Sequence, residues 1–400
     1  MSAGPVTRSS TSLDQPGAGP RPGDLLTAFT SPSRQLWGTG VAARIELPAP
    51  WVDHVDRVAE ALTALVGADP VDLPGTGPVA FGALPYDRSA PASLVVPAVV
   101  HGVSPDGTRW LTDLGAPPSA DREPPPAPRS VEVTSLRAVV DWCDAVAAAT
   151  KRIVGGELTK VVLARELQVT ADEDFDPATV FLRLRDGAPH AYCCCVDGFV
   201  AASPELLVSR VGDVVRAQPM AGTAPRSGDP ARDSRAAAEL AASTKNRIEH
   251  QITIDMVHET VLPWCSYLDA EPEPNVVPAG PVQHLATLVE GRLSQPAPSV
   301  LELVAALHPT PAVGGWPRDA ALRLQHELED AERGRYAGPV GWVDARGNGE
   351  FAVGIRSAEL DGRTARVFAG VGVVSDSDPQ SELDETRAKA QAVLSALSRT

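Results

Sequence analysis

Lysine, cysteine and long apolar runs are all scarce in this sequence of 400 residues. No stretch approaches the roughly twenty consecutive apolar residues that a membrane-spanning helix needs. The N-terminal residues contain no continuous apolar core, so they do not have the pattern of a secretory signal. These absences predict a cytoplasmic protein that does not interact with a membrane.

The few cysteines also exclude a cysteine-based metal site. The chain has 5 cysteines and no CxxC pair. Three of them, Cys193 to Cys195, are consecutive in the apolar segment AYCCCVDGFV. Successive residues of a strand point to opposite faces, so this run cannot gather into one tetrahedral metal site. We expect small buried thiols in a reducing compartment.

Several common catalytic signatures are missing. The chain contains no GxxxxGK[ST], no HExxH and no GxSxG, and without them hydrolase and nucleotide-binding functions lose their usual support. The glycines of FAGVGVV have only the spacing GxG, so a dinucleotide-binding fold is not indicated either. A formal net charge of -16 repels nucleic acid. An anionic ligand must therefore meet local positive charge or a metal.

Because lysine is scarce, each lysine is a candidate for a specific role. Only four of the 35 basic residues are lysines, namely Lys151, Lys160, Lys245 and Lys389. Arginine keeps its proton in proteins, whereas a desolvated lysine can act as a base. The segment LTKVVLARE places Lys160 beside apolar residues of a predicted buried strand, where burial disfavours the charged form of an amine.

The chain divides into three predicted regions. Residues 1–23 are rich in Ser, Pro and Gly and should be disordered. Residues 24–130 form an N-terminal part of the fold, which ends in the proline-dense loop 116–130. Short β-branched runs divided by Gly, Asp or Asn turns dominate residues 135–400. The pattern predicts an α+β protein with large antiparallel sheets packed face to face and helices outside.

The helices and one hairpin can be placed from local signals. Helical spacing predicts long helices at about 230–262, 299–307, 317–333 and 380–398, and another that ends at Gly155–Gly156. In GWVDARGNGEFAVGI we expect a hairpin that turns at Asn348–Gly349.

Two of these helices carry carboxylates that could hold a metal. STKNRIEHQ brings Lys245, Glu249 and His250 within about one helical turn, although Lys245 and Glu249 could simply form a solvated ion pair. SELDETRAKA places Glu382 and Glu385 on the same helical face as Lys389. These glutamates could merely complement the helix dipole. Alternatively, carboxylates of the two helices share Mg²⁺, which accepts one or two carboxylates and keeps waters.

A further acidic residue follows a strand. Glu205 of SPELL lies directly after the predicted strand GFVAAS. In a partly apolar pocket its carboxyl would have a raised pKa and could act as a general acid, whereas at an exposed strand end it would have no such role. The glycine-rich turns PMAGTAPRSG and FAGVGVV also follow strands and allow the backbone to approach a ligand closely.

Nine motifs, in order along the chain, resemble the chorismate-utilising enzymes, and within them most closely the isochorismate synthases. They are KVVLAR, SPELL, AGTAPR, NRIEH, QHLAT, LHPTPAVGG, GPVGWVDARGNGEFAVGIRSAE, FAGVGVV and SELDET. The similarity covers roughly residues 135–400, and FGALPYD (81–87) resembles part of the family's N-terminal half. It implies the fold of that family and a chorismate-binding catalytic domain at 135–400.

The resemblance implies a role for each motif residue. Lys160 would deprotonate a water that attacks C2 of chorismate, and Glu205 would protonate the hydroxyl that leaves C4. Glu249 and Glu385 would hold Mg²⁺, with Glu382 nearby through water. Arg356 and Lys389 would bind the pyruvyl carboxylate. The remaining substrate contacts would come from Gly222, Thr223, His284, Ala312 and Gly370.

The same residues separate the subfamilies. Anthranilate synthase-like members carry Gln where Lys160 stands, and aminodeoxychorismate synthase-like members have a lysine where PMAGT has Ala221. Salicylate synthases share the lysine and go on to eliminate pyruvate, so they are the alternative function. Asn246 stands where the family commonly has Asp. The resemblance implies a monomer that acts on chorismate for menaquinone or siderophore synthesis.

Overall fold

The computed structural model describes residues 8–13, 19–24, 26–115 and 123–398. Its largest sheet has twelve strands, and all of their pairings are antiparallel. Their order in space is β1 (Ser9–Ser12), β8 (Arg109–Asp113), β7 (Val99–Val103), β3 (Gln35–Thr39), β2 (Leu26–Thr30), β11 (Tyr192–Val196), β12 (Phe199–Ser203), β23 (Ser357–Asp361), β24 (Thr364–Val373), β10 (Lys160–Ala171) and β20 (Gly315–Trp316), with β9 (Val131–Ser135) paired to β10.

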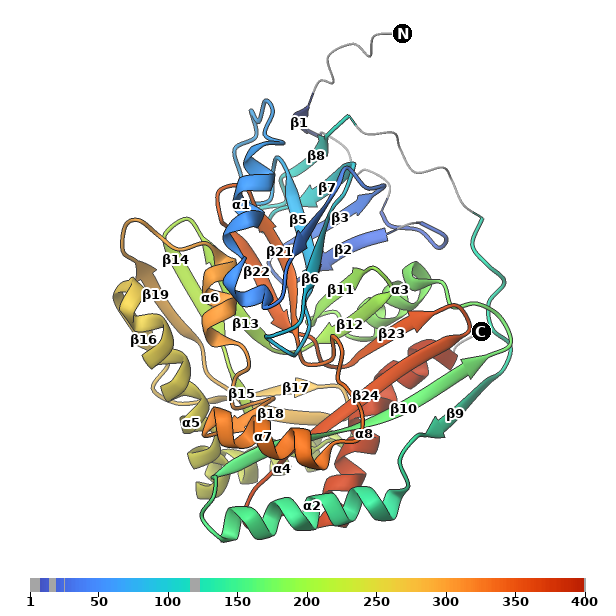
Figure 1. The fold of residues 1–400 in the computed structure, drawn as a ribbon, viewed down its shortest axis with the longest axis vertical. Coiled ribbons are helices and arrows are strands. Elements are labelled where there is room, and N and C mark those ends of the chain that lie inside the picture. Colours follow the sequence, from blue (N-terminus) through green and yellow to red (C-terminus); the bar gives the residue numbers. More distant parts are fainter. Residues whose placement is uncertain (1–7, 14–18, 25, 116–122, 399–400) are drawn as a thin grey trace.

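Two further antiparallel sheets complete the β-structure. The second has the order β16 (Cys265–Ala270), β19 (Val289–Leu293), β14 (Val214–Gln218), β13 (Leu206–Val211), β22 (Gly349–Val353), β21 (Pro339–Asp344), β5 (Val79–Ala83), β6 (Ala92–Val96) and β4 (Ala43–Leu47). The third is β15 (Met220–Pro225), β18 (Val282–Ala286) and β17 (Asn275–Ala279). Figure 1 shows the blue β5 beside the red β21, which lies more than two hundred residues away in sequence.

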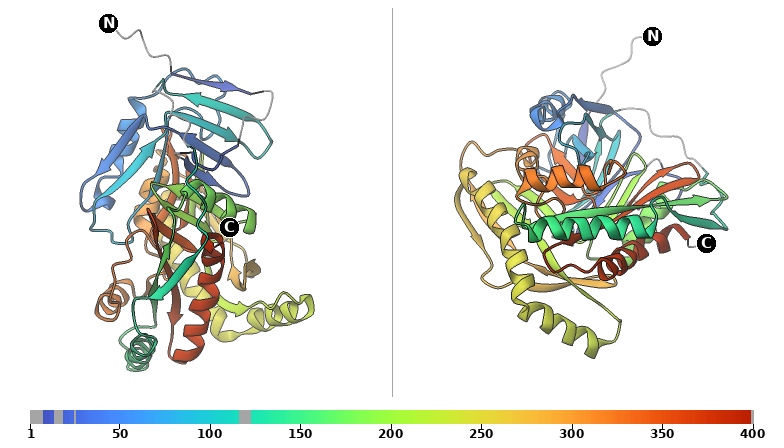
Figure 2. Two further views of the ribbon diagram at one scale, coloured as in Figure 1. Left: turned by 90° about the vertical axis from the view of Figure 1, so that its right-hand side faces the viewer. Right: turned by 60° about the horizontal axis from the view of Figure 1, so that its bottom comes forward.

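Helices cover the outer faces of these sheets. They are α1 (Asp56–Thr63), α2 (Val139–Val154), α3 (Pro177–Gly187), α4 (Pro230–Ala242), α5 (Thr244–Val261), α6 (Val300–Leu307), α7 (Arg318–Leu328) and α8 (Pro379–Ser398), with single 3₁₀ turns at Trp51–Asp53 and Leu262–Trp264. Figure 2 shows the yellow-green α4 at the edge of the molecule, followed in the chain by the yellow α5, which packs along the sheets. No helix in the described ranges is both long and apolar enough to cross a membrane.

The predicted face-to-face packing is confirmed by the core. One apolar cluster joins Phe29 and Phe199 of the large sheet to Phe81 and Trp342 of the second sheet. The cysteine run follows the alternation of its strand: Cys194 enters this cluster, whereas Cys193 and Cys195 face the helical side. All five cysteines are free thiols. The fold class predicted from the sequence, α+β with large antiparallel sheets, is therefore correct.

Local predictions needed four corrections. Ser9–Ser12 lies inside the segment predicted to be disordered, yet it forms β1 because its backbone pairs with β8. The predicted helix 230–262 is two helices, since Ser243 has extended backbone and caps α5 through the N–H of Asn246. The predicted helix 317–333 ends at Leu328. Residues 1–7, 14–18 and 116–122 of the predicted tail and loop lie outside the described residues.

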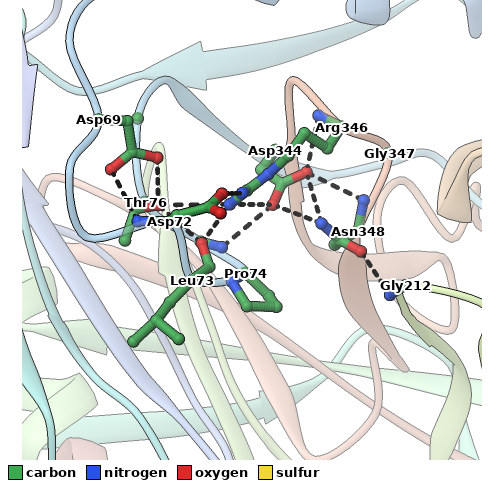
Figure 3. Close-up of polar contacts among 12 residues, drawn as sticks. Asp69, Asp72, Leu73, Pro74, Thr76, Gly212, Asp344, Arg346, Gly347 and Asn348 are labelled. Carbon is green, nitrogen blue, oxygen red and sulfur yellow. Dashed lines mark hydrogen bonds and ion pairs between the residues drawn. The ribbon is translucent and has the colours of Figure 1, made fainter.

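The fourth correction concerns the β21–β22 hairpin, which turns at residues 345–348 and not at Asn348–Gly349. Gly347 takes the positive φ of 79°, and Gly349 already belongs to β22. The side chain of Asp344 accepts hydrogen bonds from the backbone N–H groups of Arg346 and Asn348, both at 2.9 Å. It also accepts one from Gly75 N at 3.1 Å, which attaches the N-terminal half to this hairpin. Figure 3 shows Asp344 facing Arg346 and Asn348.

Candidate active site

All twelve residues predicted for the site line one pocket, with a volume of about 170 Å³. The pocket lies where β10 and β24 of the large sheet meet β15 and β18 of the third sheet and the helices α5 and α8. The twelve are Lys160, Glu205, Gly222, Thr223, Glu249, His284, Ala312, Arg356, Gly370, Glu382, Glu385 and Lys389.

Strand alternation directs Lys160 into the pocket. Val161 and Leu163 pack into the core beneath α2 and α7, so Lys160 and Val162 face the other way and line the pocket. Lys160 is only 3% exposed. A Cβ on the neighbouring Gly372 would lie 2.8 Å from Cε of Lys160, so any larger residue there would force the lysine side chain to shift.

The apolar neighbours of Lys160 in its strand predict an apolar environment for its amine. The structure shows instead a carboxylate beside it. Its Nζ lies 2.7 Å from Glu249 Oε1. The local pair that the helix spacing allows, Lys245 with Glu249, does not form, because Lys245 pairs with Asp376 at 2.7 Å instead. The base proposed from the sequence is thus ion-paired to one of the proposed metal ligands.

A buried network behind β10 holds this wall of the pocket. Arg333 donates to Glu329 at 2.6 and 2.9 Å and to the carbonyl oxygens of Val162 and Val313 at 2.8 and 2.9 Å. Glu329 in turn accepts from Ala164 N at 2.8 Å. The strand that carries Lys160 is therefore fixed by charge-assisted hydrogen bonds at Val162 and Ala164, on either side of Leu163.

Glu205 has the environment of a general acid. It is 3% exposed, at the turn between β12 and β13. Desolvation raises its pKa to about 8, against the opposing effects of the Met220 N–H and of the charges of Lys160, Arg356 and Lys389. The carboxyl is therefore protonated near neutral pH and can donate a proton.

Arg356 and His284 lie side by side in the pocket, and of the two only Arg356 carries a charge. Burial, together with Arg356 and Lys389, lowers the pKa of His284 to about 3, so the ring is neutral. Its Nδ1 lies 3.1 Å from the carbonyl oxygen of Gly222, which can only accept, and the proton is therefore on Nδ1. Nε2 is left to accept from Arg356 Nη2 at 3.4 Å. No carboxylate in the described residues forms an ion pair with Arg356.

The carboxylates of α8 differ from one another in charge environment. Lys389 and Arg356 hold the pKa of Glu385 below its usual range although desolvation opposes them, and Lys389 Nζ lies 2.6 Å from Glu385 Oε1. Lys389 also donates to the carbonyl oxygen of Gly370 at 2.9 Å. Desolvation, reinforced by Glu385, raises the pKa of Glu382 to about 7.

These carboxylates are compatible with a hard divalent cation. No three His, Cys, Asp or Glu side chains of the described ranges converge as a ready-made metal site. Mg²⁺, however, needs only one or two carboxylates besides water and substrate oxygens. Desolvation raises the pKa of Glu382 although Lys389 and Lys245 oppose it, so its carboxylate would gain from further positive charge. A cation held by Glu249, Glu382 and Glu385 would supply it.

The structure adds pocket residues that sequence reasoning missed. Tyr336 is buried, and a Cβ on Gly370 would lie 2.9 Å from its hydroxyl. Val313, Ile355, Lys245 and Asn246 also line the pocket. The shortage of lysine and the spacing of the NRIEH helix pointed to Lys245, and the NRIEH motif includes Asn246, but neither was predicted as a site residue. Tyr336 precedes the GPVGW motif, and no local sequence signal predicts that it lines the pocket. Its position there depends on the contact with Gly370 of β24, which is distant in sequence.

Comparisons with known proteins show what the chain is similar to. The family described as chorismate binding enzyme matches residues 109–398. The chain is 37% identical to isochorismate synthase DhbC of Bacillus subtilis, over 80% of this chain and 81% of that protein. It is similar to the crystal structure of DhbC from Bacillus anthracis, with a TM-score of 0.81 and 33% identity over 93% and 96% of the two chains. The menaquinone-specific isochorismate synthase MenF of Escherichia coli, at 23% identity, shares the fold with a TM-score of 0.81 over 99% and 96% of the two chains.

Proposed function

The chain belongs to the family of chorismate-binding enzymes, and we propose that within this family it is an isochorismate synthase. The observation that carries the proposal is the convergence of one lysine, one protonated glutamate and an Arg–Lys anion site on a single pocket. Relatives with more than 30% identity over most of both chains bear the same activity in their names.

In the proposed reaction a hydroxyl is exchanged across the ring of chorismate. Lys160 accepts a proton from a water as the water oxygen bonds to C2. The ring double bonds shift and the C4–O bond breaks, while Glu205 gives its proton to the departing hydroxyl. One water enters and one leaves, so the net reaction is an isomerisation.

The remaining residues bind the substrate. Arg356 and Lys389 offer N–H donors to the pyruvyl carboxylate, and the rigid guanidinium fork fixes its orientation. Neutral His284, with Thr223 and the backbone at Gly222, Ala312 and Gly370, forms the walls around the ring. This local positive charge allows a protein with a net charge of -16 to bind a dianion.

Glu249 and Glu385 are the proposed Mg²⁺ ligands, with Glu382 nearby. When bound, the ion would supply positive charge that offsets these carboxylates and the ring carboxylate of the substrate. Glu385→Gln should raise the Mg²⁺ concentration for half-maximal activity by roughly 10–100-fold, the range seen when groups at a metal site are disturbed. Magnesium-dependent thermal stabilisation should fall in parallel, and wild-type values in both assays would place the ligand elsewhere.

Product identification tests the proposed reaction. Purified protein incubated with chorismate and Mg²⁺ should form isochorismate without release of pyruvate. Release of pyruvate without a partner enzyme would instead establish the alternative, a salicylate synthase. Named relatives include 2,3-dihydroxybenzoate-specific and menaquinone-specific enzymes, so the product could serve siderophore or menaquinone synthesis. A monomeric state and a cytoplasmic location stay predictions.

A further inference from the structure

A second cavity lies directly behind the substrate pocket. Its volume is about 440 Å³, and it is bounded by the end of α3, the strand β17 and the C-terminal half of α8. Arg356 and Pro204 line both this space, here called the rear cavity, and the substrate pocket. The two spaces are therefore neighbours that share a wall.

The charge of the rear cavity is opposite to that of the protein. Among the residues that the structure describes, three arginines and a histidine line it, namely Arg183, Arg226, Arg356 and His190, and none of the described lining residues is Asp or Glu. The whole chain carries 51 acidic residues against 35 basic ones. Arg226 and Arg356 give the described part of this cavity a basic character, which in such a chain is suited to an anion.

The rest of the lining is small and apolar. Ala188, Ala191, Ala202, Ala279 and Ala396 contribute to the walls, so no bulky side chain fills the space. Known small-molecule sites enclose about 300–1,000 Å³ and combine apolar walls with a few polar groups that fix orientation. The rear cavity meets both criteria, and an aromatic or cyclic hydrocarbon body would pack against the alanines.

Arg226 is held in place but retains donors for a ligand. Its Nη1 donates to the carbonyl oxygen of Gly280 at 3.1 Å, and its Nε lies 3.4 Å from Asp233 Oδ2. Asp233 is itself occupied by the N–H groups of Ser227 and Gly228 at 2.7 and 3.3 Å. A guanidinium has five N–H donors, so these contacts leave a part of it available.

We propose that the rear cavity binds a small aromatic carboxylate, and that its occupation weakens substrate binding through Arg356. The carboxylate binds on the side of Arg226 and Arg356, with the ring between β17 and α8. The effect on the substrate rests on the proposed function, in which Arg356 binds the pyruvyl carboxylate of chorismate. An anion on one side of this guanidinium competes with the substrate for its charge and donors.

Binding is tested without chorismate, using 2-naphthoate as the probe and isothermal titration of the full chain. Arg226→Gln should weaken binding about tenfold, as expected for the loss of one charge-assisted hydrogen bond. Ala279→Phe and Ala392→Phe, two independent variants that fill the cavity, should abolish it. Arg292→Gln, which removes an exposed arginine paired with Asp213, is the matched control and should bind like wild type. The neutral 2-naphthamide should bind more weakly than 2-naphthoate to wild-type protein.

Kinetics then separate this proposal from the proposed function. In wild-type enzyme 2-naphthoate should raise KM for chorismate while kcat changes little. Both filling variants should have the kcat and KM of wild type, and 2-naphthoate should change neither value. Absence of binding to wild type, or wild-type binding to both filling variants, overturns the rear-cavity site. Binding as expected with no effect on KM would retain the site and refute the coupling through Arg356. Failure of the chorismate assay alone would count only against the proposed function.

Discussion

Two buried polar clusters in this protein differ in how far their carboxylates are compensated by hydrogen bonds. At the β21–β22 hairpin, Asp344 is 1% exposed and accepts from three backbone N–H groups and from the amide of Asn348. Asn348 Oδ1 in turn accepts from Gly212 N at 2.7 Å. In the pocket, Glu205 is equally buried, but desolvation outweighs its stabilising contacts and raises its pKa to about 8.

The difference separates a structural cluster from a functional one. Buried polar groups whose hydrogen bonds are complete stabilise a fold and have no capacity left for a ligand. Buried groups with incomplete partners lower stability, and they cluster where a substrate or a metal completes them. Changes in the pocket should therefore affect catalysis, and changes at the hairpin should affect stability.

The largest effect is expected for Lys160→Ala. Loss of the proposed base should lower kcat by about 10²–10⁴-fold, the contribution typical of general acid–base catalysis. Chorismate binding, measured by titration, should be nearly intact because Arg356 and Lys389 remain. Lys151→Ala, which removes an exposed lysine of α2, is the matched control. Unchanged turnover of the Lys160 variant would refute the assignment.

Asp344→Ala should affect stability and leave KM unchanged. The substitution leaves three backbone N–H groups without their acceptor, at roughly 1–3 kcal/mol for each buried donor that finds no water. We expect the free energy of unfolding, measured in urea, to fall by about 3 kcal/mol. A stable variant with impaired kinetics would contradict the division between the two clusters.

Glu205→Gln should lower kcat about 100-fold, because the amide cannot protonate the leaving hydroxyl. In the wild-type enzyme the acid form disappears as the pH rises through about 8, so kcat should fall on that side of its pH profile. If the variant instead showed only a raised KM, the proton donor would be another group.

The same carboxyl should also make stability depend on pH. Its pKa is raised from an ordinary 4.5 to about 8 in the folded state, so its contribution is fully present below 4.5 and is lost as the pH rises to about 8. Glu205→Gln removes this dependence. Urea unfolding at several pH values should give a smaller loss of stability across this window for the variant than for wild type.

The smallest effect is expected at the exposed edge of the hairpin cluster. Arg346 pairs with Asp72 at 2.5 Å, but the two side chains are 40% and 83% exposed. Pairs of this kind contribute less than about 1 kcal/mol. Arg346→Ala should therefore change the unfolding midpoint only slightly. A loss similar to that of Asp344→Ala would show that the pair of Arg346 with the buried Asp344, at 3.8 Å, contributes as much as the backbone donors.

Much of the site was predictable because its residues lie in motifs whose order along the chain is distinctive. Lys160, Glu205 and Glu385 could be singled out from one sequence, and all three line the pocket. Their contacts could not be predicted in this way. Glu249 has a lysine four residues earlier on its own helix, yet it pairs with Lys160, 89 positions away on another element.

The sequence by itself determined the α+β class, the alternation of the cysteine run and the residue types available for proton transfer. These follow from local periodicity and side-chain chemistry, which are written in neighbouring residues. The tertiary structure alone decided which charges meet, where Tyr336 and Arg333 support the pocket, and that a cationic cavity lies behind Arg356. Pairing and burial depend on which distant strands lie side by side, and no single stretch of the chain carries that information.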